Sequence, residues 1–558
     1  MKKLIACALS AVTMMASLSG CSFLNGLGGN NDNWQDYDNL AEFYATEYDN
    51  DAVVAADETD AGDVDSWHAQ VYTKTGGNND MPTNNALIRS PYHTLKVNGK
   101  EVPVYSARAA KGVHSFAWLD VKGAPKNFAL KVELTLSEDF AKCVVLPESR
   151  NVEVKIAEQT VTSYLTEYRS FTYTFADEVV DDITDPTLAP LTIMVAPEAE
   201  LEIPEGYNKV EIEPGYHEDR ELVFQDEEMV YVMKKGLHEI TEIRVPSNSI
   251  LFLERGAYLQ ATERGSDADG WNTATPIHFD DITNSKLISR GLLDCGKLLG
   301  GDGKHKHVFN AARSSDLHIE GLTIINANTW SMCFYSNENV EIERNLLISY
   351  RTYSDGIMMS ECRDSVGRYN FVRTGDDSIE FKGTGWWNGT TPGSNCVYEY
   401  NDLWTDKGAG YCLTYENNCA MSNMVFRNNS IGFAQPNWAD RCTAIDVLLG
   451  INPETVWGNV TFENIEIYHV ESPNVMQIYL KDNSGTVENI TFQNITVKSI
   501  SMNTRIFRLA KDAPSGSISN VLLKNIMFTG KKLVEADKEN MLLIDNDAPT
   551  YMDQVTIE

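Results

Sequence analysis

A short pattern ending in Asn-Ile recurs in the C-terminal part of the chain, and it constrains the fold more than any other feature. It reads NVTFENI, NITFQNI and NVLLKNI, with copies that start 30 and 31 residues apart, at 459–465, 489–495 and 520–526. Looser copies occur at 316–322, 339–345 and 423–429. Each copy alternates as a strand does and lacks a helical period. A strand-bearing repeat of this length is typical of a parallel β-helix, in which each coil stacks on the previous one.

We therefore predict an all-β chain with a right-handed parallel β-helix over 216–558. A leucine-rich repeat is the competing architecture, but its fixed leucine template is absent. The recurring asparagines are interpreted as corner residues, because asparagine tolerates the left-handed conformation and bonds locally. Before the repeats, short runs such as Leu130–Leu136 alternate apolar and polar residues between turns such as Val97-Asn-Gly-Lys. This pattern predicts an antiparallel β-sandwich over 86–215.

The N-terminus has the pattern of an export signal. Two lysines precede an apolar run, which ends in Leu18-Ser-Gly-Cys21. The cysteine after small residues resembles a bacterial lipobox, so we predict that 1–20 is removed and that Cys21 carries a lipid anchor. The alternative is an ordinary signal peptide that contains a cysteine. Residues 21–85 are rich in Asn, Asp, Gly and Glu and are predicted to form a flexible tether to the cell envelope.

The charge composition of the chain disfavours some classes of binding partner. Asp and Glu number 80 against 46 Lys and Arg, which gives a formal charge of −34. This charge argues against nucleic acid and disfavours acidic polymers unless a local basic cleft exists. No metal or cofactor pattern is visible, so none is expected, although a calcium site is left open; the chain is expected to act as a monomer. Disulfides and buried thiols are both left open for Cys396, Cys412, Cys419 and Cys442.

Three aspartates follow the coil spacing. Asp355 begins Asp-Gly-Ile and Asp377 begins Asp-Ser-Ile, 22 residues later, with Asp376 beside it. Neighbouring coils lie about 4.8 Å apart, so residues one coil apart become lateral neighbours. We expect Ile357 and Ile379 to stack in adjacent coils, which would bring the three carboxylates together. Like charges at such distances raise the pKa of one carboxyl group and leave that of another unraised, as acid/base hydrolysis requires. The alternative is a ladder of aspartates that caps turns.

The same segment resembles a known clan. Gly321–Trp330, Ser354-Asp-Gly and Thr374-Gly-Asp-Asp are similar to glycoside hydrolase families 28 and 49, the polygalacturonase and dextranase/isopullulanase families. The resemblance implies an inverting hydrolase in which Asp376 is the general acid. Asp355 and Asp377 would then hold and deprotonate the attacking water.

Two departures from the family pattern bear on the substrate. The family 28 Gly-His-Gly corresponds to Gly408-Ala-Gly410, and its Arg-Ile-Lys corresponds to Ala444-Ile-Asp446. Arginine and lysine are the natural partners of a uronate, whereas Asp446 would repel one. We therefore expect a neutral, dextran-like α-glucan as the polysaccharide substrate, with polygalacturonan as the alternative. A polysaccharide lyase and an inactive surface glycan-binding protein are further alternatives, disfavoured by the acidic cluster and by the presence of all three aspartates.

The remaining candidates are substrate contacts. Trp386 and Trp387 lie on a glycine-flanked insertion that suits a sugar-stacking wall. After Asp377, strand alternation should turn Ile379 and Phe381 inward, and Glu380 and Lys382 to the outer face of the coil. The other candidates are Trp404, Lys407, Tyr411 and Glu416. For the aromatic residues, the competing interpretation is that they fill packing gaps.

Overall fold

The computed structural model describes residues 53–55, 88–176, 188–263, 275–298, 307–387, 391–436, 443–500, 504–538, 542–546, 551 and 553–558. Strands dominate them, with short 3-10 turns at Glu148–Arg150 (η4) and Glu535–Asp537 (η5). The predicted signal segment and Cys21 lie outside these residues. In this part of the chain, no helix has the length and hydropathy needed to cross a membrane.

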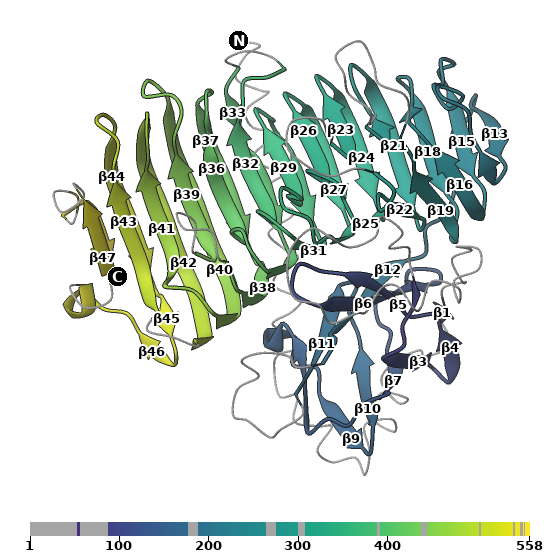
Figure 1. The fold of residues 1–558 in the computed structure, drawn as a ribbon, viewed down its shortest axis with the longest axis horizontal. Helices are drawn as coiled ribbons and strands as arrows, with labels where there is room; N and C mark the ends of the chain where they lie inside the picture. Colours follow the sequence, from purple (N-terminus) through teal and green to yellow (C-terminus); the bar gives the residue numbers. More distant parts are fainter. Residues whose placement is uncertain are drawn as a thin grey trace, which may run out of the picture.

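The C-terminal part of the chain forms the predicted right-handed parallel β-helix (Figure 1). One wall, here called the short sheet, is built from the parallel strands β17 (Ile243–Arg244), β20 (Ile277–His278), β23 (Phe309–Ala312), β26 (Met332–Tyr335), β29 (Ile357–Ser360), β32 (Ile379–Gly383), β36 (Tyr411–Asn417), β39 (Ile445–Leu449), β41 (Asn474–Leu480), β43 (Arg505–Lys511) and β47 (Leu542–Asn546).

The other strands of the coils join into a long sheet, which bends so that most coils contribute two strands to it. Its members are β13 (Asn208–Ile212), β14 (Gly215–Tyr216), β15 (Met229–Met233), β16 (Gly236–Ile240), β18 (Ser249–Leu253), β19 (Ala257–Ala261), β21 (Thr283–Ser289), β22 (Leu292–Asp294), β24 (Ser315–Glu320), β25 (Thr323–Ile325), β27 (Glu338–Glu343), β28 (Leu346–Ile348), β30 (Val366–Arg368), β31 (Phe371–Thr374), β33 (Gly393–Ser394), β34 (Val397–Glu399), β35 (Asp402–Thr405), β37 (Met421–Arg427), β38 (Ser430–Ala434), β40 (Val456–Val470), β42 (Thr486–Ile500), β44 (Ser517–Lys524), β45 (Met527–Phe528), β46 (Lys531–Lys532) and β48 (Val555–Ile557).

The repeat asparagines occupy the corners of the coils, as predicted. Asn459, Asn489 and Asn520 have positive φ angles of 56°, 56° and 52°. Their amides form a ladder in which each Nδ2 donates to the Oδ1 of the asparagine one coil earlier, at 3.1 Å and 2.7 Å. Inside this part of the β-helix Phe426, Phe462 and Phe492, from three successive coils, stack with ring centroids 4.6 and 5.1 Å apart. The recurring pattern therefore fixes both the corner and the core of each coil.

The β-helix begins before the predicted boundary at 216. β13 already pairs in parallel with β15. Four of the five β13 residues are exposed, so the strand lacks the apolar alternation that marks a core-facing segment in a sequence.

The preceding domain is a sandwich of two sheets. One contains β1 (Val53–Ala55), β2 (Ile88–Arg89), β5 (Tyr105–Arg108), β6 (Val113–Val121), β8 (Lys142–Leu146), β11 (Ser170–Ala176) and β12 (Leu191–Pro197). The other contains β3 (His93–Val97), β4 (Lys100–Val102), β7 (Leu130–Leu136), β9 (Val154–Ala157) and β10 (Thr160–Leu165). Two details differ from the sequence predictions. β12 pairs in parallel with β6, so the sandwich is not purely antiparallel, and β1 draws a piece of the predicted tether into the sheet.

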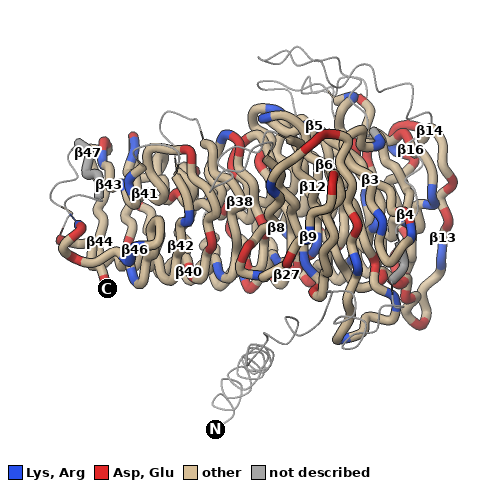
Figure 2. Tube along the Cα trace, turned by 90° about the horizontal axis from the view of Figure 1, so that it is seen from below, with Lys and Arg blue, Asp and Glu red and all other residues tan. Residues whose placement is uncertain are grey.

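The sandwich packs against the coils, beside β25, β31 and β38 in Figure 1. Trp118 lies in a shared apolar cluster and donates its indole N–H to Thr323 Oγ1 at 2.9 Å. Buried ion pairs join the two domains: Arg290 with Asp120 at 2.7 Å and Arg150 with Asp402 at 2.8 Å. Figure 2 shows acidic and basic residues interspersed along both domains.

Candidate active site

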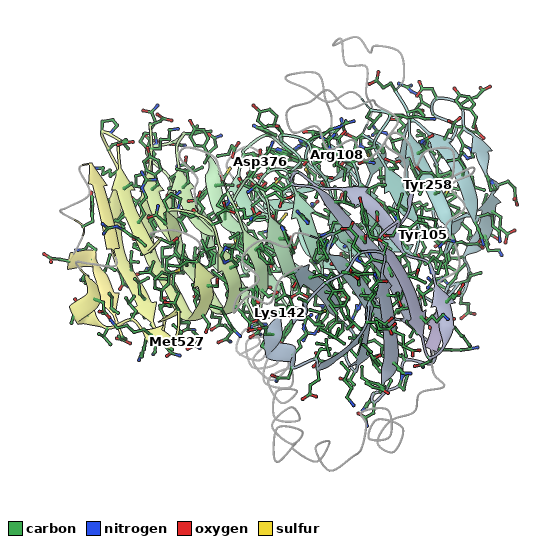
Figure 3. All side chains as sticks on the ribbon, turned by 60° about the horizontal axis from the view of Figure 1, so that its bottom comes forward. Tyr105, Arg108, Lys142, Tyr258, Asp376 and Met527 are labelled. Carbon is green, nitrogen blue, oxygen red and sulfur yellow. The ribbon has the colours of Figure 1, made fainter. Side chains whose placement is uncertain are left out.

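The predicted aspartates meet where strands of the short sheet begin. Ile357 pairs with Ile379, which confirms the predicted register. The Gly356 N–H therefore donates to the Asp377 carbonyl at 2.9 Å, and Asp355 lies one coil from Asp377. Figure 3 labels Asp376 on the coils and Arg108 at the end of β5 of the sandwich. We call residues 375–378 the aspartate turn.

The aspartate turn is held by its neighbours on both sides. The Ala409 N–H donates to Asp377 Oδ1 at 2.8 Å, and the Asp377 N–H donates to Asp376 Oδ1 at 3.0 Å. On the preceding coil, Ser354 Oγ accepts the Gly375 N–H at 3.0 Å. A Cβ on Gly408 would lie 2.4 Å from backbone atoms of Asp376 and Asp377, so only glycine fits there. The orientation of the aspartates thus depends on main-chain contacts from adjacent coils.

Lys382 is the cation of this cluster. Its ammonium lies 3.2 Å from Glu416, 3.4 Å from Glu380 and 3.6 Å from Asp355. The same Nζ lies 4.1 Å from the ring centroid of Trp330, within the range of a cation–π interaction. One lysine therefore faces three carboxylates and an indole.

Strand alternation in β32 is as predicted. Ile379 and Phe381 belong to the core of the β-helix, and Glu380 and Lys382 lie on the opposite face. The side chains of Glu380 and Lys382 are nevertheless almost completely buried on that face. These two residues interact with the carboxylates of the site rather than lining an open surface.

Burial and mutual repulsion change the protonation of the cluster. Burial, followed by the charge of Glu380, raises the pKa of Asp355 well above its usual value, although Lys382 opposes the shift. Burial likewise raises the pKa of Glu380 to about 8, against the effect of Lys382. Burial opposes the charge of Lys382, but the surrounding carboxylates, Glu380 foremost, raise its pKa well above the usual value. The site therefore retains a proton on the Asp355–Glu380 pair at neutral pH beside a fixed cation.

Two clusters of the described residues have metal-ligand geometry, and neither has the chemistry of a metal site. Asp377, Glu380 and Cys412 offer ligand atoms within 4.8 Å of one another, but burial raises the pKa of the Cys412 thiol well above its usual value. Lys382 already supplies the positive charge there. The second cluster consists of His318, Glu320 and Glu343. Its Glu343 carboxylate is already bound by Arg344 and Arg368, which compete with any cation.

The two tryptophans of the insertion are exposed, at 57% for Trp386 and 38% for Trp387. Trp386 stacks on Trp330 with centroids 5.6 Å apart and planes 9° from parallel. Trp330 in turn stacks on His307 at 5.0 Å and 6°. We call the rings of Trp386, Trp330, His307 and Tyr335 the aromatic platform. Sequence reasoning missed Trp330 and His307 as site residues, although Met332 pairs with Ile357 and so puts Trp330 in register with Asp355.

Two predicted sugar contacts are wrong. Tyr411 is fully buried and donates its hydroxyl to the Asn401 carbonyl at 3.1 Å, because it pairs with the inward-facing Ile379. Trp404 is buried where the sandwich meets the coils and donates its indole N–H to Asp406 Oδ1 at 3.0 Å. Glu416 does join the site through Lys382. Lys407 lies half-buried in the turn that contains Gly408 and contributes no ion pair among the described residues.

Beyond the aspartates the outer face of the short sheet stays polar. Glu380 pairs with Cys412, and Cys412 pairs with Asp446. Asp446 is buried and accepts a hydrogen bond from Gln477 Nε2 at 2.7 Å, and Gln477 Oε1 accepts one from Arg508 at 3.1 Å. This row places a carboxylate in the coil where the resembled family has its basic residues.

The seven cysteines in the described residues are buried, and no disulfide joins any two of them; they lie at positions 143, 295, 333, 362, 396, 412 and 419. This finding favours the buried-thiol interpretation for Cys396, Cys412 and Cys419. Cys442, the fourth disulfide candidate, lies outside the described residues.

Comparison with known proteins finds similarity in fold, in solved structures. No family profile matches the sequence, and no curated protein matches it. Among solved structures, Dex49A from Penicillium minioluteum superposes with a TM-score of 0.65 at 11% identity, over 85% of this chain and 95% of that one. The family 28 exopolygalacturonase from Yersinia enterocolitica gives a TM-score of 0.46 at 13% identity, over 77% of this chain and 96% of that one. The chain thus shares the Dex49A fold over most of its length.

Proposed function

We propose that the chain hydrolyses glycosidic bonds of a polysaccharide by a single displacement with inversion. The observation that carries the proposal is the convergence of Asp355, Asp376 and Asp377 from adjacent coils, with Asp355 beside the buried Lys382. Inverting hydrolysis needs a protonated carboxyl on one side of the bond and an ionised one beside a water on the other. The fold shared with Dex49A supports the same class.

In this mechanism Asp376 donates its proton to the glycosidic oxygen as the bond to the anomeric carbon breaks. Asp377, oriented by the Ala409 N–H, and Asp355 hold the water that attacks from the opposite face. The water gives one proton to this carboxylate pair and its oxygen to the anomeric carbon, leaving a new reducing end of inverted configuration and an alcohol. Because Asp355 and Glu380 share a retained proton, Asp377 is the member of the pair that accepts the proton of the water, and Lys382 stabilises the remaining charge beside Asp355.

Two buried cations near the aspartate turn, Lys382 and Arg373, are already paired with carboxylates of the chain, which favours a neutral sugar at the cleavage point. Lys382 faces three carboxylates. Arg373 is bound to Asp406 through two hydrogen bonds of 3.0 Å. A uronate would approach Asp446 without help from either of these two cations, and a like-charge pair 4 Å apart costs about 1 kcal/mol even in water.

A panel of dextran, pullulan, galactans and polygalacturonate, assayed by release of reducing ends, tests both the activity and its class. We expect a neutral α-glucan to be cleaved with the highest kcat/KM, at least about tenfold above polygalacturonate, which corresponds to about 1.4 kcal/mol. Assays at low and high salt form the control, because screening narrows a gap caused by exposed charges. Faster cleavage of polygalacturonate than of every neutral glycan would contradict the assignment of a neutral sugar, and no cleavage at all would contradict the function.

The aromatic platform is proposed to bind the apolar face of a pyranose ring next to the cleaved bond. Trp386 to Ala should raise KM roughly 3- to 10-fold with little change in kcat, as expected for the loss of one stacking contact of about 0.5–1.5 kcal/mol. Tyr216 to Ala removes a similarly exposed ring from the first coils, 68% exposed, and should leave KM unchanged. An unchanged KM in the Trp386 variant, or an equal rise in both, would remove the platform from the binding site.

A further inference from the structure

The tip of the β5–β6 hairpin of the sandwich reaches the coils beside the aspartate turn. The Lys111 N–H donates to Asp406 Oδ2 at 3.1 Å, and Arg373 Nη2 donates to the Lys111 carbonyl at 2.7 Å. Arg373 lies two residues before Gly375, the first residue of the aspartate turn, and Asp406 begins the turn of the next coil. One hairpin residue therefore bonds both partners of an ion pair that spans two coils.

This ion pair is buried and fully oriented. Arg373 donates to Asp406 from Nε and Nη2, both at 3.0 Å, in the planar two-bond geometry that guanidinium and carboxylate favour. Arg373 Nη1 donates to Nδ1 of His114 at 3.1 Å, and His114 Nε2 bonds to Thr192 Oγ1 at 2.7 Å. Burial and the charge of Arg373 lower the pKa of His114 well below its usual value, so the ring is neutral and Nδ1 accepts. Two sandwich strands thus fix the arginine.

A short path connects this pair to the aspartates. Asp406 opens the turn that contains Gly408 and Ala409, and the Ala409 N–H is the donor to Asp377 Oδ1. Thr405 Oγ1 donates to the Gly408 carbonyl at 2.5 Å, which braces the same turn from within. Gly408 lies directly against the backbone of the aspartate turn. A displacement of Asp406 would move the donor that orients Asp377.

The two buried ion pairs that join the sandwich to the coils lack such a path. Asp120 is buried and binds Arg290 and Arg255, which lie on earlier coils. Asp402 begins β35 and binds Arg150, at the opposite end of that strand from Asp406.

From this contrast we infer that Asp406 and Arg373, clamped by the Lys111 hairpin, are positioning residues for the aspartate turn. The sandwich is then part of the working site rather than a separate accessory domain. This inference rests on the proposed hydrolysis where it is tested by kinetics. Its test by amide hydrogen exchange depends only on the geometry of the main chain.

The experiment compares Asp406 to Asn with Asp120 to Asn in the full chain. Each variant removes one buried charge at the boundary between the sandwich and the coils, so both should lower Tm. Only Asp406 to Asn should lower kcat, by roughly 10-fold or more, with KM nearly unchanged, because misplacing a catalytic group costs rate rather than binding. Arg373 to Lys keeps the charge but not the two-bond geometry and should lower kcat in the same direction; it also serves if Asp406 to Asn fails to fold.

Amide hydrogen exchange provides a readout that does not depend on the substrate. The amides of residues 375–378 and 406–410 should exchange faster in the Asp406 variant than in the wild type. In the Asp120 variant their exchange rates should be unchanged. Equal losses of kcat in both variants, or unchanged exchange in the two turns, would overturn the positioning role. A wild-type chain that cleaves no glycan would instead reject the proposed function, and the exchange comparison would still decide the inference.

Discussion

Asp376 to Asn is expected to leave the fold intact and to reduce hydrolysis by about 10²-fold or more, the scale of a lost general acid. Asparagine is nearly isosteric with aspartate, so its amide can still accept the Asp377 N–H now bound by Oδ1 at 3.0 Å. It cannot deliver a proton to the leaving oxygen. Initial rates on the best glycan of the panel, together with Tm, measure the two effects separately.

The matched control is Asp316 to Asn. Asp316 is an aspartate at a coil corner, with a φ of 55°, but it is exposed and far from the aspartate turn in sequence. It should retain full activity. Full activity in the Asp376 variant at an unchanged Tm would reject its role as the acid. A first product of retained anomeric configuration would independently reject the single displacement.

Lys382 to Met is expected to have the largest effect on stability. Among the described residues Lys382 is the only cation paired with Asp355 and Glu380, and an unpaired buried charge costs about 3–5 kcal/mol. Urea unfolding at constant m-value measures the loss. The control is Lys297 to Met, which breaks a partly exposed pair with Glu239 at 2.7 Å and should cost less than about 1 kcal/mol. Equal losses in the two variants would contradict the central position of Lys382.

The pH dependence gives a second measurement on the same variant. The pKa of Glu380 is raised in the fold from 4.5 to about 8, so the folded chain keeps a proton that the unfolded chain releases. Stability contributed by this group is therefore present at low pH and is lost as pH rises from about 4.5 to about 8. Without Lys382 the pKa values of Glu380 and Asp355 rise further. The variant should consequently lose more stability relative to wild type at pH 8 than at pH 5.

The sequence predicted those features that depend on register within the coils. The 22-residue interval was sufficient to pair Ile357 with Ile379 and to bring Asp355 beside Asp377. Tyr411 was misassigned because the insertion after β32 hides the register of the next coil, although its pairing with Ile379 makes it a core residue. Trp404 and Arg373 could not be interpreted from coil geometry, since part of what covers them belongs to the other domain: Leu146 in the case of Trp404 and Lys111 in the case of Arg373.

The aromatic platform shows a different limit. Trp386 is recognisable as exposed because its insertion has no core pattern. Trp330 and His307 can be recognised as site residues only once the coils are stacked, because a long stretch of sequence separates them from Trp386. The share of Glu380 and Lys382 in the acid/base cluster likewise depends on burial, which strand alternation alone does not predict.

The amide ladder of Asn459, Asn489 and Asn520 has a consequence for how this molecule loses structure. Each rung bonds only to the coils directly above and below, and the phenylalanine stack inside follows the same rule. Such an array behaves as a one-dimensional chain of nearest-neighbour couplings. Melting can therefore start at the C-terminal rungs and travel inward coil by coil, while the middle coils stay closed against the sandwich. Length at that end is a modular quantity: a whole coil can be added or removed there without changing the phase of the coils around Asp376.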